Sequence, residues 1–160
     1  MMLFAKLTSI SCGNELHSFW RLFYRREKAK ALLTRRFLAF LVNVSARRHG
    51  GYIGNGAKIA GVPTMPHGLH GVYISRYACI GADCCIYQNV TIGEVDRKAP
   101  RIGNRCLIGA NACVIGDITI GDDVKIGAGA VVACDVPGGS TVVAQAPRMI
   151  VKAGRNGWKI

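Results

Sequence analysis

The sequence predicts a mainly β protein, a coil of short strands preceded by one or two α-helices. Three observations support this fold class: a six-residue rhythm of Ile and Val, a glycine that follows many of these residues, and an N-terminal segment without Gly or Pro. The chain has 160 residues, of which 50% are hydrophobic. This length and composition suit one compact domain with a short appendage.

The six-residue repeat is carried by ten positions that are all Ile or Val. They are Ile74, Ile80, Ile86, Ile92 and, after a ten-residue step, Ile102, Ile108, Val114, Ile120, Ile126 and Val132. Gly follows in most units, and the fifth residue is small or β-branched, as in Ala78 and Cys84. This period fits neither an amphipathic helix nor an alternating hairpin strand. It fits a solenoid whose first residue fills the interior and whose Gly adopts corner angles that other residues resist.

The limits and interruptions of the repeat are also visible. The same rhythm upstream indicates that the coil begins near Tyr52, and a short final strand is expected at 141–144. The register slips between residues 65 and 74. A second interruption adds four residues, which predicts a polar loop at 94–100 pushed out of a corner.

The N-terminal segment is basic and predicts helices. Residues 14–46 contain no Gly or Pro, and their apolar residues recur every three or four positions. Residues 1–50 hold ten Lys or Arg against two Asp or Glu, so most of the +12 net charge belongs there. We expect a solvated basic face whose apolar side packs on the trimer. Association with an anionic inner membrane surface is the second interpretation, and no motif supports a nucleic-acid partner.

Several classes of protein are excluded by the sequence. The longest nearly uninterrupted apolar run, at 37–44, is far shorter than a membrane-spanning helix, and the first ten residues do not form a signal peptide. We therefore expect a cytoplasmic protein. The seven cysteines show neither zinc-site spacing nor an even count, so packing explains them better than disulfides or metal ligands.

The repeat resembles a known family. The run IGANACVIGDITIGDDVKIGAGAVV at 108–132 is similar to the hexapeptide-repeat acyltransferases, and Pro66-His-Gly-Leu-His-Gly71 and Tyr87-Gln-Asn-Val-Thr-Ile-Gly93 resemble their serine acetyltransferase branch. The resemblance implies a left-handed parallel β-helix with three hexads per turn, assembled as a homotrimer. It also implies an acetyl-CoA-dependent O-acetyltransferase that transfers the acetyl group directly, without an acyl-enzyme. The expected organisation is a helical segment at 1–50, the β-helix at 51–151 and a basic tail at 152–160.

The resemblance places the catalytic base at His67. His70 is the lesser candidate, since the interval from His67 to Gly71 is one residue longer than in the best-known members. Imidazole suits this task, because a hydroxyl must lose its proton near neutral pH as it attacks a thioester. The alternative is that His67 is only a turn residue between Pro and Gly.

The resemblance also assigns the acyl-donor contacts. The corner residues Ala110 and Ala128 would meet the pantetheine arm of acetyl-CoA, although each could serve only in packing. Arg148 and the nearby Lys152 would meet the phosphates, which require a cation. No metal is expected, because the repeat has no His after position 70 to supply a metal site.

The acceptor was inferred from departures from the family pattern. Tyr52 and Pro66 stand where the serine enzymes have Asp, and the loop at 94–100 has no His. We therefore expect the acceptor to be a sugar hydroxyl of a cell-surface polysaccharide or its precursor. A serine O-acetyltransferase of cysteine biosynthesis is the alternative, and a non-catalytic hexapeptide-repeat scaffold is the second alternative.

Overall fold

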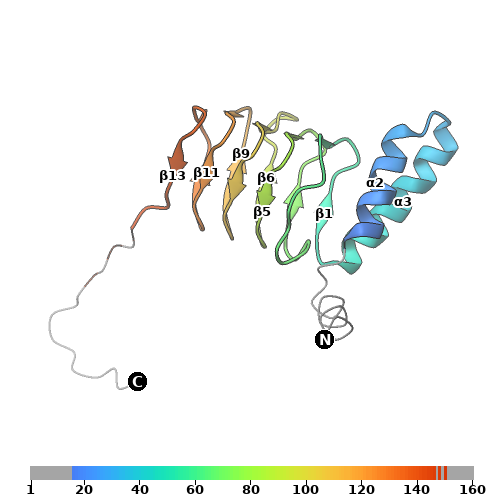
Figure 1. Cartoon of the computed structure of the whole chain (residues 1–160), viewed down its shortest axis with the longest axis horizontal. Helices are drawn as coiled ribbons and strands as arrows, with labels where there is room; N and C mark the ends of the chain where they lie inside the picture. The colour runs from blue at the N-terminus through green and yellow to red at the C-terminus, as the bar shows by residue number, and fades with distance from the viewer. Residues whose placement is uncertain (1–15, 147, 149, 151–160) are drawn as a thin grey trace, which may run out of the picture.

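Two helices stand at one end of a solenoid (Figure 1). The computed structural model describes residues 16–146, 148 and 150. Helix α2 (His17–Lys28) and helix α3 (Leu32–Arg48) form a hairpin, and the solenoid follows from Tyr52. No helix in the described part of the chain has the length and apolar character needed to cross a membrane.

The solenoid has three faces, each a parallel sheet. Sheet A contains β1 (Tyr52–Ile53), β3 (Tyr73–Ile74), β6 (Thr91–Gly93), β9 (Cys113–Ile115) and β12 (Val131–Val132). Sheet B contains β2 (Lys58–Ile59), β4 (Cys79–Ile80), β7 (Arg101–Ile102) and β10 (Thr119–Ile120). Sheet C contains β5 (Cys85–Ile86), β8 (Leu107–Ile108), β11 (Lys125–Ile126) and β13 (Thr141–Val142). Successive strands belong to different sheets, and the three corners between them are called the A–B, B–C and C–A edges.

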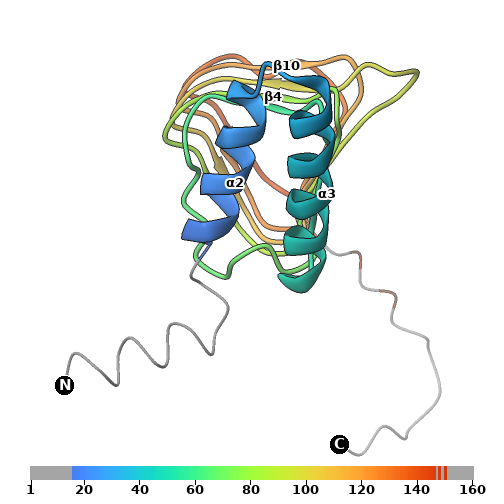
Figure 2. The same cartoon turned by 90° about the vertical axis from the view of Figure 1, so that its right-hand side faces the viewer.

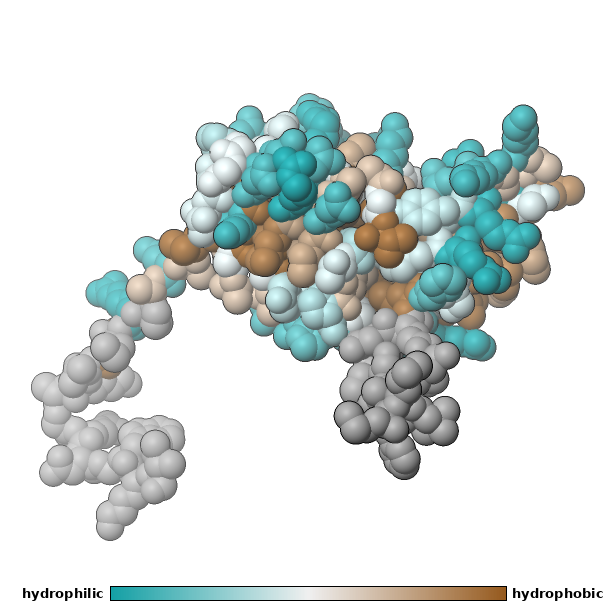
Figure 3. All heavy atoms as spheres, viewed as in Figure 1, coloured by the Kyte–Doolittle hydropathy of each residue, from teal (hydrophilic) through white to brown (hydrophobic). Residues whose placement is uncertain are grey.

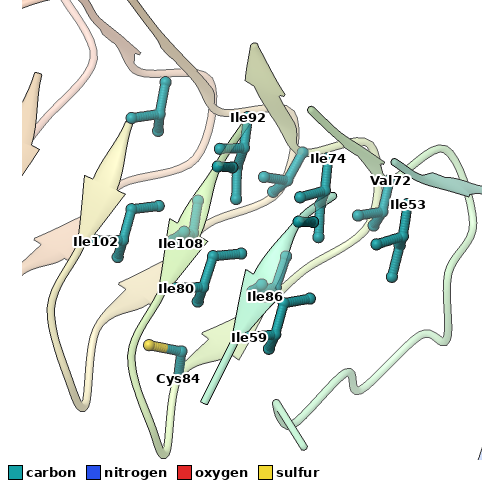
Figure 4. Close-up of a cluster of buried hydrophobic side chains, with 14 of the residues drawn as sticks. Ile53, Ile59, Val72, Ile74, Ile80, Cys84, Ile86, Ile92, Ile102 and Ile108 are labelled. Carbon is teal, nitrogen blue, oxygen red and sulfur yellow. The ribbon is translucent and has the colours of Figure 1, made fainter. Parts of the chain in front are cut away.

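The interior is filled as the repeat predicts. The Ile or Val that opens each unit is buried, and Figure 4 shows Ile53, Ile74 and Ile92 projecting inward from successive turns of the coil. The small fifth residues are buried as well, with Ala78 fully covered. Because each strand offers only one large inward side chain, stacking of the turns makes a single continuous core.

The corner glycines serve a different purpose from the one expected. None of the six that follow the repeat Ile or Val has a positive φ. The positive φ falls two residues later, at positions such as Asp83 and Asn111, and Asn and Asp tolerate this conformation well. Instead, a Cβ on Gly109 would lie 2.6 Å from the amide nitrogen of Ala128 in the next turn. Glycine is therefore required by close approach between turns, not by its backbone angles.

The helix hairpin closes the N-terminal end of the solenoid. In Figure 2 both helices cover the end of the coil, and the yellow-green loop that matches residues 94–100 projects sideways from it. Aromatic side chains of α2, among them Phe19 and Phe23, are fully buried. The buried Arg26 lies over the Phe23 ring and donates a 3.2 Å hydrogen bond to Asn55 Oδ1, in the turn after β1. The hairpin and the first turn of the solenoid thus share one core.

Candidate functional site

The two candidate histidines lie in an enlarged turn on the C–A edge. The first irregularity of the repeat becomes a run of turns at 66–71, between the Thr64 bridge to sheet C and β3 of sheet A. Leu69, at its centre, is fully buried, and the amide of Gly68 donates to Met65 O at 3.0 Å. The buried leucine anchors the turn, while His67 and His70 remain exposed at its surface.

The surroundings of the two histidines differ. The ring centroid of His67 lies 6.0 Å from that of Tyr87, on the next turn of the coil. His70 lies toward the helices: its Nδ1 would be 3.3 Å from a Cβ placed on Gly50, just after α3. The backbone oxygen of His70 accepts a 2.9 Å hydrogen bond from the amide of Asn89. His70 thus stabilises the C–A edge through its backbone. His67 is therefore the histidine that faces along the C–A edge.

Ala110 and Ala128 lie on this same edge, two and three turns beyond His67. Hydrogen bonds between turns hold the edge together, since Asn111 donates its amide to Gln88 O and Gly129 donates its amide to Ala110 O. A side-chain bond of 3.2 Å from Asn89 Nδ2 to Asn111 Oδ1 adds to this ladder. The residues predicted from separate motifs thus form one line along the solenoid.

The amides of Ala110 and Ala128 are unpaired within the described part of the chain, and we call them open in this sense. Neither N–H group has a hydrogen-bond acceptor among the described residues. The Ala128 side chain is exposed and that of Ala110 is half-buried. An unpaired donor at the surface can bond water or a ligand carbonyl without breaking an existing contact. The edge can therefore bind an extended chain that carries amide oxygens.

Of the two predicted phosphate contacts, only Arg148 is among the described residues. The amide of Gly127 donates to Val142 O at 2.8 Å, so the chain leaves β13 directly above the C–A edge. Arg148 follows a few residues later and is exposed. Lys152 falls outside the described residues.

The polar loop at 94–100 lies on a different edge. It follows β6 and precedes β7, at the A–B edge, and is closed by two 2.9 Å backbone hydrogen bonds between Val95 and Lys98. Glu94 accepts a hydrogen bond from the buried Ser75 hydroxyl, and Lys98 pairs with Asp117 at 2.8 Å. Sheet A separates this loop from the His67 turn within one chain.

Two residues of the next turn on the C–A edge were not among the predicted site residues. Tyr87 is the ring neighbour of His67, and the Oε1 atom of Gln88 is buried with no hydrogen-bond partner among the described residues. The sequence held a signal for Tyr87, because it occupies a position where most units have Gly. The orientation of the Gln88 amide has no counterpart in the repeat and needed the structure.

The cysteines of the B–C edge are buried. Cys84 and Cys106 are each 1% exposed, and burial raises the pKa of the Cys84 thiol to about 11. A protonated thiol is a poor nucleophile, which agrees with a structural role. The described residues contain no cluster of three or more His, Cys, Asp or Glu that could hold a metal ion.

Comparison with known proteins identifies the repeat. Residues 99–134 match the family described as bacterial transferase hexapeptide (six repeats). The serine acetyltransferase of Helicobacter pylori is 45% identical over 101 residues, which are 61% of this chain and 58% of that protein. The serine acetyltransferase of Bacillus licheniformis is 38% identical over 145 residues, or 88% of this chain and 66% of that protein. The chain thus spans about three fifths to two thirds of these curated relatives.

Solved structures agree with the sequence relatives. The Neisseria gonorrhoeae serine acetyltransferase in complex with serine superposes with a TM-score of 0.64 at 35% identity, covering 71% of this chain and 48% of that one. The soybean serine acetyltransferase apoenzyme has a TM-score of 0.64 at 31% identity, covering 89% of this chain and 56% of that one. The predicted fold class, a left-handed parallel β-helix preceded by one or two helices, is confirmed, and the described residues form two helices.

The predicted sugar acceptor on a polysaccharide is wrong, because relatives at 38–45% identity are named serine acetyltransferases. That prediction relied on side chains missing at Tyr52, Pro66 and the loop 94–100. A missing group at one position does not remove the contact if another residue supplies it, and the loop carries both carboxylates and cations. By its repeat, its fold and its relatives, the chain belongs to the hexapeptide-repeat acyltransferases, in their serine acetyltransferase-like branch.

Proposed function

We propose that this protein is an acetyl-CoA-dependent serine O-acetyltransferase. The observation that carries the proposal is the C–A edge, where His67 lies in line with the open amides of Ala110 and Ala128. The relatives that share this framework are named serine acetyltransferases, and one was solved in complex with serine. The acceptor would therefore be the hydroxyl of a small amino acid.

In this proposal His67 is the general base. Its imidazole would accept the proton of the serine hydroxyl as the oxygen attacks the thioester carbonyl, and the thiol of CoA would leave. Tyr87, beside the His67 ring, would limit the positions that the imidazole can take. Negative charge develops on the carbonyl oxygen during attack, and backbone N–H groups at the corners would stabilise it.

The acyl donor would lie along the C–A edge. The Ala110 and Ala128 amides fit a pantetheine arm, which offers amide oxygens along an extended chain. Arg148 would pair with its phosphates, because a guanidinium matches phosphate geometry in two hydrogen bonds. Lys152 is a further candidate for the same contact.

We also propose that the acceptor site is completed by a neighbouring copy in a homotrimer. The loop 94–100 and His67 lie on opposite sides of sheet A, so the loop of one copy could serve the histidine of another. Support comes from the outer face of sheet A, whose outward residues are uncharged: Tyr52, Tyr73, Thr91, Cys113 and Val131. Sheets B and C instead expose Lys or Arg, such as Lys58 and Lys125.

The test is a comparison of acceptors with the full chain. We expect the thioester absorbance of acetyl-CoA to fall when L-serine is added, with L-alanine as the matched amino acid that lacks the hydroxyl. Following the thioester avoids a thiol reagent, which would also react with exposed cysteines such as Cys134. Turnover with sugars but not serine would refute serine as the acceptor. Failure to bind acetyl-CoA at millimolar concentration in calorimetry would favour a non-catalytic scaffold.

A further inference from the structure

Helix α3 has a second apolar face that no other described residue covers. Its buried residues, Val42 and Ala46, pack against the rest of the molecule. On the opposite side, Leu33, Phe37 and Phe40 are 80%, 61% and 62% exposed. Their spacing of four and three residues places them on one side of the helix, and we call them the α3 stripe. Aromatic and aliphatic side chains of this size are seldom left exposed in a row unless they contact a partner.

The surroundings of the α3 stripe are strongly basic. On a helical projection Arg36 and Arg47 border the stripe on one side and Arg48 on the other, and all three are exposed. Helix α3 contains no acidic residue, and residues 16–48 as a whole hold nine Lys or Arg against one Glu. Figure 3 shows hydrophobic residues at the surface of this end of the molecule beside hydrophilic ones.

We propose that the α3 stripe docks this protein on an anionic lipid surface. An interfacial helix buries an apolar stripe among the acyl chains, while flanking cations reach the lipid headgroups. A second copy that met this one through the same helix fits less well, because it would bring an equally basic helix against α3. A nucleic acid would pair with the arginines but would leave the apolar stripe unused. Helix α3 has 17 residues and is not long and apolar enough to cross a membrane. It would therefore lie in the plane of the surface.

The experiment is vesicle co-sedimentation of the full chain. Vesicles of phosphatidylcholine with about one third phosphatidylglycerol should bind the protein, whereas phosphatidylcholine alone should bind it at least about tenfold more weakly. Raising the salt concentration to about 1 M should release most of the bound protein, because the Debye length falls to about 3 Å. Equal binding to both vesicle types would overturn the role of charge.

Two sets of variants assign the binding to the helix. Leu33→Ser/Phe37→Ser/Phe40→Ser should lower binding about tenfold or more, whereas the matched set Val62→Ser/Val95→Ser/Val143→Ser, at exposed solenoid positions, should not. Arg36→Gln/Arg47→Gln/Arg48→Gln should also weaken binding, unlike Lys58→Gln/Arg76→Gln/Lys125→Gln, which removes the same charge from the solenoid.

Other outcomes would contradict the proposal. If the α3 stripe variant bound vesicles normally but formed a smaller assembly in light scattering, the stripe would be a contact between copies. Binding to duplex DNA without binding to anionic vesicles would assign the basic face to nucleic acid. Acetyl transfer by the stripe variant should equal that of the native chain, so loss of docking is distinguishable from failure of the proposed enzymatic function.

Discussion

The B–C and C–A edges have the same repeated backbone but differ in whether side chains accept hydrogen bonds from their corner amides. On the B–C edge, the amide of Ala82 donates to Asn104 Oδ1 at 2.9 Å, and the amide of Asn104 donates to Asp122 Oδ1 at 2.7 Å. In these two successive steps, a side chain of the next turn thus covers the amide of the turn before it. At the equivalent positions of the C–A edge the residues are Ala110 and Ala128, which have no side-chain acceptor to offer.

This difference shows how one repeat can serve both structure and function. The hexads fix the backbone of every edge, so stability alone would favour an Asn or Asp ladder wherever amides are exposed. An edge that lacks these Asn or Asp side chains leaves its backbone N–H groups available to a ligand. The enlarged turn with His67 lies on the open edge, which is why we place the site there.

The largest expected effect concerns the open edge. His67→Ala should lower kcat about 100-fold or more, because no other group would accept the hydroxyl proton, while acetyl-CoA binding stays nearly unchanged. His70→Ala is the matched control, since it removes an exposed imidazole from the same turn but on the side of Gly50. Steady-state kinetics and calorimetry measure the two quantities. A larger loss in His70→Ala than in His67→Ala would reverse the assignment.

A smaller effect should follow from closing the open edge. Ala128→Asn places an amide oxygen where Asn104 has one on the B–C edge, so it should cover the Ala110 N–H. We expect KM for acetyl-CoA to rise about tenfold with kcat changed less, since a ground-state contact is lost. The unfolding temperature should not fall, because a hydrogen bond is added. An unchanged KM for acetyl-CoA would mean that the donor does not use this amide.

The reverse experiment opens the closed edge. Asp122→Ala removes the acceptor of the Asn104 amide and should lower the unfolding temperature by a few degrees, with no change in KM for acetyl-CoA. Hydrogen bonds from Asn104 hold the pKa of Asp122 below its ordinary value. A lowered pKa stabilises the fold above the unfolded-state value of about 3.9. The difference from the native chain should therefore persist at neutral pH and shrink as the pH falls through the lowered pKa.

Much of the fold could be predicted because it follows from the six-residue spacing of Ile and Val. The repeat Ile and Val positions locate the strands, and Val132 at the last regular position is buried as expected. The reason for the glycines could not be predicted, because the approach of Gly109 to Ala128 depends on the distance between turns. Only the stacking of the coil reveals that distance.

The candidate site was predictable in parts. His67 was identified from one motif, and Ala110 and Ala128 from another. The 18-residue spacing of the two alanines equals three hexads and predicts that they share one edge, but it does not show that His67 lies on the same edge. That alignment depends on how many residues each turn contains, including the enlarged turn at 66–71. The acceptor could not be predicted correctly, because an argument from absent side chains overlooks groups supplied from elsewhere.

The smallest expected effect lies inside the closed edge. The thiol of Cys84 donates to Gly103 O at 3.3 Å, and burial raises its pKa from about 9 to about 11. In the native protein at pH 8, Cys84 should therefore resist a thiol reagent that modifies the exposed Cys134 rapidly. A raised pKa stabilises the fold below pH 9 and loses that contribution as the pH rises toward 11. The free energy of unfolding, measured with denaturant, should fall less between pH 9 and 11 in Cys84→Ala than in the control Cys134→Ala. Equal losses in the two variants would show that the fold does not hold the Cys84 thiol protonated.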